Sequence, residues 1–253
     1  MSDFQVPVVT TVPPTPGLSQ WERVICSFTA PSRTFTDIKR NTSWWLPFLL
    51  TAIFGYALFA AVQIKVTWPQ VAENSVKLNA KQAEQLDKLP PEQRAANMKI
   101  SALVTQGIFA GLPILGILIT AVTSGVLLAT INFGFGGKAK FWEVFSVSWY
   151  AALPGLIKFF LGTIALFAGL SPESFNLNNF AGTNLGYYLS PGETPKALLA
   201  LASAIDPITI WSLVLTAIGI SIVAGTKRSA GYIAVFGWWI LTVLVGVGAA
   251  AAF

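Results

Sequence analysis

Residues 100–137 read ISALVTQGIFAGLPILGILITAVTSGVLLATINFGFGG, a run of 38 positions without one charged side chain. A helix needs ~20 mostly apolar residues to cross the ~30 Å hydrocarbon core of a bilayer. The run is therefore longer than one crossing requires, but two crossings would leave almost no loop between them. We expect one span over residues 102–132 that tilts, projects beyond the bilayer, or breaks near Gly111, Pro113 and Gly116.

Four more apolar runs of membrane-spanning length accompany this one, over residues 44–64, 145–170, 207–224 and 232–252. Three of them contain no charge, and the run over 145–170 is interrupted by Pro154 and Lys158. The predicted fold is therefore all-α: a polytopic membrane protein with a bundle of five transmembrane helices and short interfacial or amphipathic helices.

The composition supports a membrane protein and excludes several kinds of chemistry. Of 253 residues, 54% are hydrophobic and 11% are charged, less than half of the ~25% that soluble domains carry. Histidine is absent, and the single Cys26 excludes an intramolecular disulfide and any paired-cysteine metal motif. We therefore expect no metal, no cofactor and no enzymatic activity. The net charge of +5 comes from scattered basic residues, so we expect membrane lipids rather than nucleic acid as partners.

The chain before the first span divides into two parts. Residues 1–18 are rich in proline and predict a flexible tail without a cleavable targeting segment. Residues 19–40 predict two short amphipathic helices, and residues 41–253 form the membrane domain. In the first helix the apolar residues fall on one face, at Trp21, Val24, Ile25 and Phe28. Two interpretations of this face stay open: it lies in the lipid headgroup layer, or it packs on the protein's own bundle.

Basic residues in the loops predict the orientation, because Lys and Arg accumulate on the cytoplasmic side. With the N-terminus inside, the inner segments carry eight of them: Arg23, Arg33, Lys39, Arg40, Lys138, Lys140, Lys227 and Arg228. The first outer loop carries six basic residues, which favour the opposite orientation. The shorter connections favour a cytoplasmic N-terminus and a C-terminus outside.

Lys158 and Asp206 are the candidate ligand-binding or lipid-binding residues. A lysine in a span costs ~2.5–3.5 kcal/mol on insertion scales, so it is a functional candidate. It is expected to bind an anionic substrate or a lipid phosphate, to pair with Asp206, or simply to extend its stem toward the headgroups. Asp206 precedes Pro207, where a carboxylate caps a helix.

Two further patterns concern packing. Gly107 and Gly111 form a GxxxG motif, which predicts close helix approach inside the bundle in preference to dimerisation. Trp142 and Trp149 flank the start of the third span and are typical of an interfacial aromatic belt.

Three segments resemble the Yip domain family of Ypt/Rab-interacting membrane proteins, especially its bacterial branch. They are FTAPSRTFTDI (28–38), FGGKAKFWEVFSVSWYAALP (135–154) and IDPITIWSLVL (205–215), and together with the five spans they cover roughly residues 24–250. The resemblance implies a five-helix bundle with a cytoplasmic N-terminus in the bacterial inner membrane, without enzymatic activity. The chain lacks the long N-terminal region and the Asp-Leu-Tyr-Gly-Pro-type motif of eukaryotic members, which puts binding of a Rab-type GTPase in doubt.

Two functional hypotheses follow. The first is a scaffold or adaptor that organises membrane proteins or lipids, with a membrane-protein partner or a second copy of the chain. The second is a small transporter, channel or lipid-moving protein that uses Lys158 and the broken helices at Pro113 and Pro154.

Overall fold

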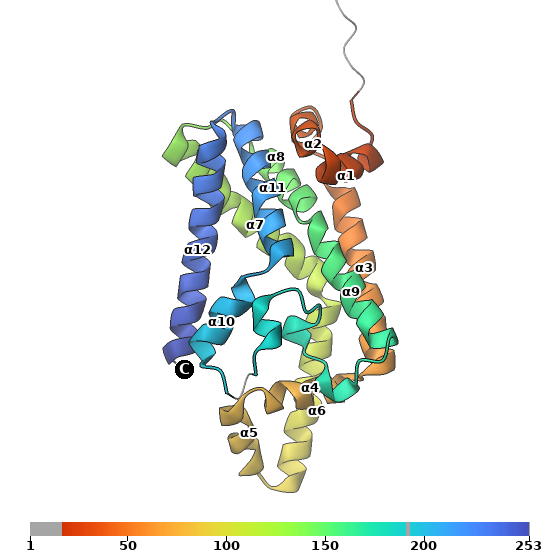
Figure 1. The fold of residues 1–253 in the computed structure, drawn as a ribbon. Helices are drawn as coiled ribbons and strands as arrows, with labels where there is room; N and C mark the ends of the chain where they lie inside the picture. The colour runs from red at the N-terminus through yellow and green to blue at the C-terminus, as the bar shows by residue number, and fades with distance from the viewer. Residues whose placement is uncertain (1–16, 191–192, 253) are drawn as a thin grey trace, which may run out of the picture.

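The computed structural model describes residues 17–190 and 193–252, and these residues form helices without β-strands. Residues 1–16 of the expected tail lie outside the described residues. Figure 1 shows long helices running side by side, with two short helices across one end and a helical extension at the other. The predicted all-α fold class is confirmed.

Five helical segments are long and apolar enough to cross a membrane. They are α3 (Trp45–Lys65), α7 (Leu112–Ala129) with the π-helical turn Thr130–Gly134, α8 (Phe141–Ala151) with α9 (Leu156–Phe167), α11 (Pro207–Ala224) and α12 (Arg228–Ala252). Many of their large apolar side chains are exposed on the outside of the bundle, as expected where lipid surrounds the protein. The chain is an integral, multi-pass membrane protein.

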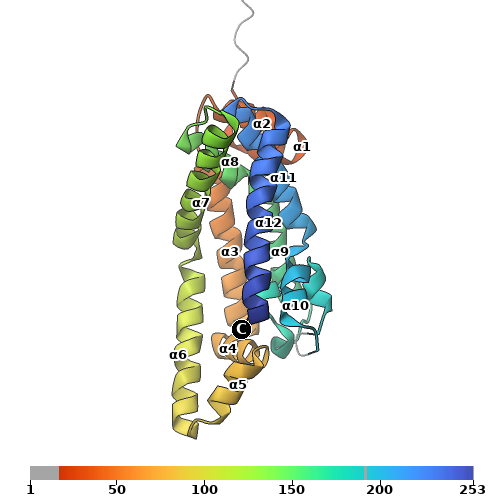
Figure 2. The same ribbon diagram turned by 90° about the vertical axis from the view of Figure 1, so that its left-hand side faces the viewer.

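The long uncharged run is divided between two helices that meet at a break. The helix α6 (Pro91–Ala110) ends at Gly111, and α7 begins at Leu112. Pro113 has no N–H to donate to the carbonyl four residues earlier, and its ring conflicts with a continuous helix there. The hydroxyl of Tyr56 donates to the carbonyl of Ala110 beside the break, at 2.9 Å. Of the alternatives expected for the span over 102–132, the structure shows a break near Gly111 and Pro113. Figure 2 shows α6 below α7, and α6 projects beyond the bundle.

The third apolar span also changes direction at a proline. A 3₁₀ turn (Leu153–Gly155) that contains Pro154 separates α8 from α9. As a result, α9 packs along α3 while α8 packs against α7 and α11. The bend places Lys158, near the start of α9, toward the middle of the bundle.

Two apolar clusters hold the helices together. The first joins α2, α7, α8, α11 and α12, and the second joins α3, α4, α6 and α9. Helices approach closely at two glycines beside the first cluster. A Cβ on Gly231 of α12 would collide with the backbone of Ala217 in α11, and one on Gly219 of α11 would collide with Val147 in α8. Small residues permit such approaches between membrane helices.

The remaining elements cover the two ends of the bundle. α1 (Gln20–Thr29) and α2 (Pro31–Ile38) lie across one end. α4 (Trp68–Lys77), α5 (Ala80–Asp87) and the start of α6 form the extension at the other. Between α9 and α11 the chain forms three 3₁₀ turns (Pro172–Ser174, Leu177–Asn179, Leu185–Tyr188) and α10 (Lys196–Ala204), which packs beside α12.

Candidate functional site

Lys158 and Asp206 meet between two membrane-spanning segments. Lys158 lies in the first turn of α9, and Asp206 is the N-cap residue of α11. The lysine Nζ lies 2.8 Å from Asp206 Oδ2, and the two side chains are 28% and 3% exposed. Of the alternatives that the sequence left open for Lys158, the structure shows pairing with Asp206.

The carboxylate of Asp206 is fully engaged. Its Oδ1 accepts the backbone N–H groups of Ile208 and Thr209, at 2.8 and 3.0 Å. Its Oδ2 accepts the hydroxyl of Thr183, at 2.7 Å, in addition to the ion pair. Asp206 therefore caps α11, as its position before Pro207 indicated, and at the same time binds two other segments of the chain.

The ammonium group of Lys158 has a second partner, the hydroxyl oxygen of Thr209, at 2.9 Å. Thr183 and Thr209 were not singled out by the sequence, because hydroxyl residues are numerous and only the folded chain shows which ones meet a charge. The pair places one positive and one negative charge inside the bundle, and together they carry no net charge. Removal of Lys158 would leave Asp206, which is 3% exposed, as a buried, uncompensated ion.

A cavity lined by hydroxyl groups adjoins this pair. It has a volume of about 410 Å³ and lies between α7, α8, α11 and α12. Thr209 links the two features, since its side chain binds Lys158 and also lines the cavity. Two indole rings, Trp238 and Trp239, close the α12 side. The hydroxyl-bearing residues of the lining are Thr120, Thr123, Ser148, Thr209, Ser212, Thr216 and Thr242.

The apolar face predicted on the first helix divides into an outer and an inner part. Trp21 and Ile25 are each 60% exposed, and Phe28 is partly exposed while its ring contacts Trp211, 5.6 Å between centroids. Val24 instead packs against the first apolar cluster. Of these four side chains, Val24 and Phe28 therefore contact the bundle, and Trp21 and Ile25 face outward.

A buried ion pair fixes α1 to α2. The guanidinium of Arg23 is fully buried and lies 2.7 Å from Asp37 Oδ2, and it also donates to the carbonyl of Asn41 at 2.8 Å. Asp37 binds Arg40 on its exposed side at 2.9 Å. Desolvation acts to raise the pKa of Asp37, but the hydrogen bonds from Arg40 and Arg23 outweigh it and hold the pKa below its usual value.

Two hydrogen bonds attach the α1–α2 pair to the membrane bundle, and a third attaches the segment that follows α2. The hydroxyl of Tyr150 in α8 donates to the side-chain oxygen of Gln20 at 2.7 Å. Ser146 donates to the carbonyl of Thr42 at 2.6 Å, and Arg228 at the start of α12 donates to the hydroxyl of Ser32 at 3.1 Å. The two short helices are thus attached to the bundle. We call these two helices, residues 19–40, the platform.

Two sequence predictions on packing are not met. No atom from another element lies within 4 Å of a Cβ built on Gly107, and the nearest atoms to one on Gly111 belong to its own helix. The internal packing expected at this GxxxG motif occurs instead at Gly219 and Gly231. Of the two residues expected in an aromatic belt, only Trp142 is exposed. Trp149 is buried among Trp44, Phe48 and Phe145.

Potential metal ligands are dispersed. Within residues 17–190 and 193–252, no three His, Cys, Asp or Glu side chains come together as the ligands of a metal ion would.

A family model described as the Yip1 domain matches residues 25–250, nearly the whole chain. No curated protein and no solved structure matches the chain.

Proposed function

The chain belongs to the Yip1 domain family, and from this premise we propose that it is a non-enzymatic scaffold or adaptor that organises membrane lipids or membrane proteins. In this proposal the protein resides in a bacterial inner membrane, with the platform on the cytoplasmic side and the C-terminus outside. The observation that carries the proposal is the platform itself, a rigid helix pair that exposes Trp21 and Ile25 at one end of the bundle.

The rigidity of the platform supports this role. A short helix with exposed apolar side chains is typical of segments that lie in the headgroup layer, where tryptophan and isoleucine insert between lipids. Such a helix usually needs the membrane to order it. Here the buried Arg23 and its contacts with Asp37 and Asn41 hold the helix in place, so binding would cost little ordering entropy.

The proposal is tested by purifying the full chain from its native membrane in lipid nanodiscs and identifying the proteins and lipids that accompany it. We expect a stoichiometric protein partner or an enriched lipid class with the wild type, and its loss in the double variant Trp21→Ser, Ile25→Ser. The control is Leu78→Ser, which removes an exposed apolar side chain outside the platform. An identical set of accompanying molecules in all three proteins would refute the proposal.

The hydroxyl-lined cavity favours a second candidate, a small transporter, channel or lipid-moving protein. Its support is the contact of Thr209 with both the cavity and Lys158, which would place a cavity beside an intramembrane charge.

This second candidate predicts flux of an ion, a solute or a labelled phospholipid through the wild-type protein in liposomes. The variant Lys158→Leu with Asp206→Asn removes both charges while asparagine keeps the helix cap, and it should abolish that flux. Wild-type liposomes that move nothing above protein-free vesicles would exclude the transport hypothesis.

A further inference from the structure

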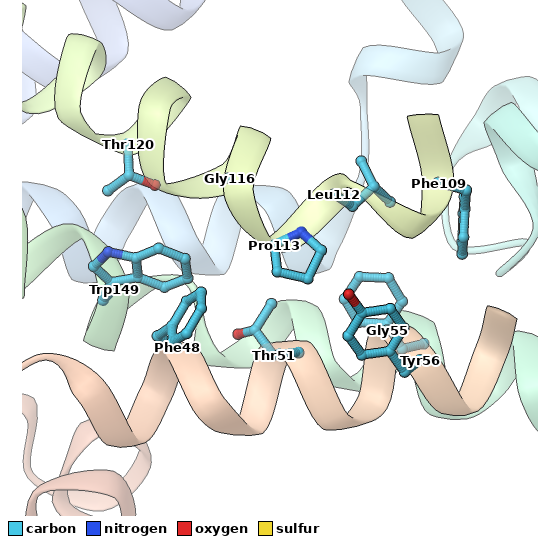
Figure 3. Close-up of a pocket in the computed structure, with 12 residues that line it drawn as sticks. Phe48, Thr51, Gly55, Tyr56, Phe109, Leu112, Pro113, Gly116, Thr120 and Trp149 are labelled. Atoms are coloured by element: carbon cyan, nitrogen blue, oxygen red, sulfur yellow. The ribbon is translucent and has the colours of Figure 1, made fainter. Parts of the chain in front are cut away.

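A second cavity lies beside the break between α6 and α7. It has a volume of about 220 Å³ and is bounded by α3, by the break, by α8 and by α9 (Figure 3). The hydroxyls of Thr51 and Tyr56 in its wall already donate to backbone carbonyls, at 2.8 and 2.9 Å. None of the described residues that line this cavity carries a charge, so its walls select no particular ligand.

A groove on the surface of the platform is lined by charged side chains instead. It has a volume of about 480 Å³ and lies between α2 and residues 17–18. Arg33, Asp37 and Arg40 line it at positions four and three residues apart, so they share one side of α2 and of the turn that follows it. A groove with this lining can select a ligand by its charge.

The groove carries a surplus of positive charge. Asp37 is the one carboxylate among the described residues that line it, and the fully buried guanidinium of Arg23 lies 2.7 Å from that carboxylate and balances it. The charges of Arg33 and Arg40, two exposed side chains, remain uncompensated. Arg40 spends two of its nitrogens on Asp37. The side chain of Arg33 makes no hydrogen bond with a residue that the structure describes, so its N–H groups are free to bind a ligand.

A third arginine reaches the groove from the start of α12. Arg228 donates to the hydroxyl oxygen of Ser32 at 3.1 Å, and Ser32 lines the groove. Because Ser32 accepts in this contact, its own hydroxyl hydrogen stays free to donate. Guanidinium groups present planar forks of N–H donors that match the oxygens of a phosphate, and a hydroxyl adds one more donor. The groove thus offers the donors that a phosphate group needs.

The groove also lies at the more positively charged end of the molecule (Figure 1). This end carries the eight basic residues that the sequence assigns to the inner segments and three acidic ones, Glu22, Asp37 and Glu143, which gives a net charge of +5. Residues 65–99 and 171–205, in the opposite half, carry seven basic and six acidic residues. The positive charge is therefore concentrated around the platform, where it attracts anions over ~8–10 Å at physiological salt.

The contact between α1 and α2 indicates the source of the anion. Trp21 and Ile25 on α1 are each 60% exposed, and an ion pair holds α1 against the helix that carries the groove. An exposed apolar face beside cationic side chains is typical of helices that bind anionic lipid surfaces. Phosphate groups lie at the hydrated edge of the bilayer, so a groove on α2 can hold one while Trp21 and Ile25 insert between neighbouring lipids.

We propose that this groove binds the phosphate group of an anionic phospholipid, with Arg33 and Arg228 as its main donors and Arg40 and Ser32 beside them. The surplus of positive charge sets the preference among lipids. It favours a headgroup with a net negative charge, such as phosphatidylglycerol, and repels the ammonium group that phosphatidylcholine carries next to its phosphate. The inference rests on the proposed function for one point, the contact of the platform with the membrane, and it adds the lipid class that the platform recognises.

The double variant Arg33→Gln, Arg228→Gln tests the groove. Both side chains are exposed, and neither belongs to the ion pair that joins α1 to α2, so the platform should stay folded. Lys77→Gln with Lys99→Gln is the matched control, because it removes two exposed positive charges from the opposite end of the molecule. Hydrogen exchange of α1 amides, unchanged from the wild type, verifies an intact platform in both variants.

The experiment uses the full chain in nanodiscs that contain equal amounts of phosphatidylglycerol and phosphatidylcholine. After release into detergent, native mass spectrometry counts the lipids that stay bound. We expect the wild type and the lysine control to retain phosphatidylglycerol in preference to phosphatidylcholine. In the arginine variant this preference should fall by about five- to thirtyfold, the factor that one to two basic residues near an anionic lipid supply. No preference in the wild type, an unchanged preference in the arginine variant, or an equal loss in the lysine control would overturn the proposal.

Inorganic phosphate distinguishes a lipid headgroup from a soluble anion. Millimolar inorganic phosphate, present during the release into detergent, should leave phosphatidylglycerol bound to the wild type, because the acyl chains keep the lipid at a high effective concentration beside the protein. Displacement of phosphatidylglycerol by inorganic phosphate would assign the groove to a soluble anion and contradict the lipid proposal.

The variant Trp21→Ser, Ile25→Ser separates failure of this inference from failure of the proposed function. It keeps every arginine, so the preference for phosphatidylglycerol should persist, and its loss would assign the selectivity to the apolar face and contradict the role of the groove. A preference that depends on Arg33 and Arg228, together with identical accompanying molecules in the wild type and in Trp21→Ser, Ile25→Ser, would support the groove and refute the proposed function.

Discussion

Polar residues in this bundle act in pairs that link distant parts of the chain. Arg23 and Asp37 are fourteen residues apart, and Lys158 and Asp206 are forty-eight residues apart. Each carboxylate also accepts further hydrogen bonds, so neither pair depends on Coulomb attraction alone. A buried pair of this kind is costly to break on one side, because the remaining charge is left in an apolar environment.

The pair between α9 and α11 gives the first prediction. Asp206→Ala should lower the stability through the uncompensated Lys158 by less than the ~3–5 kcal/mol of a fully buried pair, because Lys158 is 28% exposed, with about 1 kcal/mol more from the lost cap. The midpoint of unfolding in a denaturing detergent measures this change. The double variant Lys158→Leu, Asp206→Asn should unfold close to the wild type, and a double variant as unstable as Asp206→Ala would contradict a charge-pairing role.

The second prediction concerns pH and the platform. The folded-state pKa of Asp37 lies below that of the unfolded chain, ~3.9, so its contribution is fully present above that value and is lost as the pH falls through the folded-state pKa. Hydrogen exchange of α1 amides should therefore stay slow from neutral pH to about 4 and accelerate, after correction for the intrinsic rate, below it.

The control for this measurement is Asp37→Asn, which removes the titrating group. Its α1 amides should exchange faster than those of the wild type at neutral pH and show no further transition on acidification. A transition of the same size in Asp37→Asn would assign the pH dependence to another group.

At the scale of elements, the helix breaks define the cavities. Pro113 lies in the first turn of α7, where a backbone N–H has no partner within the helix, so its absence costs little. The break itself is at Gly111, the residue after the end of α6. Pro154 similarly separates α8 from α9. The prolines in these two apolar segments predicted the breaks, because a proline lacks the N–H that a continuous helix needs. The cavities beside the breaks depend on neighbouring helices, which the local sequence does not specify.

The break at Pro113 gives the third prediction. Pro113→Ala restores an N–H and should straighten the α6–α7 junction, since alanine is the best helix former. Spin labels at Gln93 in α6 and Phe133 beyond α7 should then report a longer mean distance by double electron–electron resonance. Gly125→Ala, at an open position of α7, is the control. An unchanged distance in Pro113→Ala would show that packing against Tyr56 and α3 bends the chain without the proline.

The elements were predictable from the sequence to different degrees. The five apolar segments followed from their length without charge, because a bilayer leaves few other places for such runs. The GxxxG motif at Gly107 did not lead to the predicted helix contact, because a local pattern does not specify whether another helix lies opposite it. The partners of Arg23 and Lys158 and the burial of Trp149 depend on contacts between distant segments, which spacing along the chain does not encode.

At the scale of the whole molecule, the orientation in the membrane is the fourth prediction. In a Cys26→Ser background, Gln93→Cys in the extension and Lys138→Cys at the platform end should lie on opposite sides of the membrane. A membrane-impermeant maleimide should label Gln93→Cys in intact cells and Lys138→Cys only after permeabilisation. The reverse pattern would place the platform outside and show that the six basic residues of the first loop set the orientation.

The central claim is that the platform is a rigid surface embedded in the headgroup layer, and spin-label accessibility tests it most directly. Labels placed singly at Trp21, Ile25, Arg33 and Lys39 in nanodiscs are compared for collision with oxygen, which concentrates in the bilayer, and with a water-soluble nickel chelate. We predict that oxygen dominates at Trp21 and Ile25 and the chelate at Arg33 and Lys39. Predominant access of the chelate to all four positions would contradict the account, because the exposed face of α1 would then lie in water.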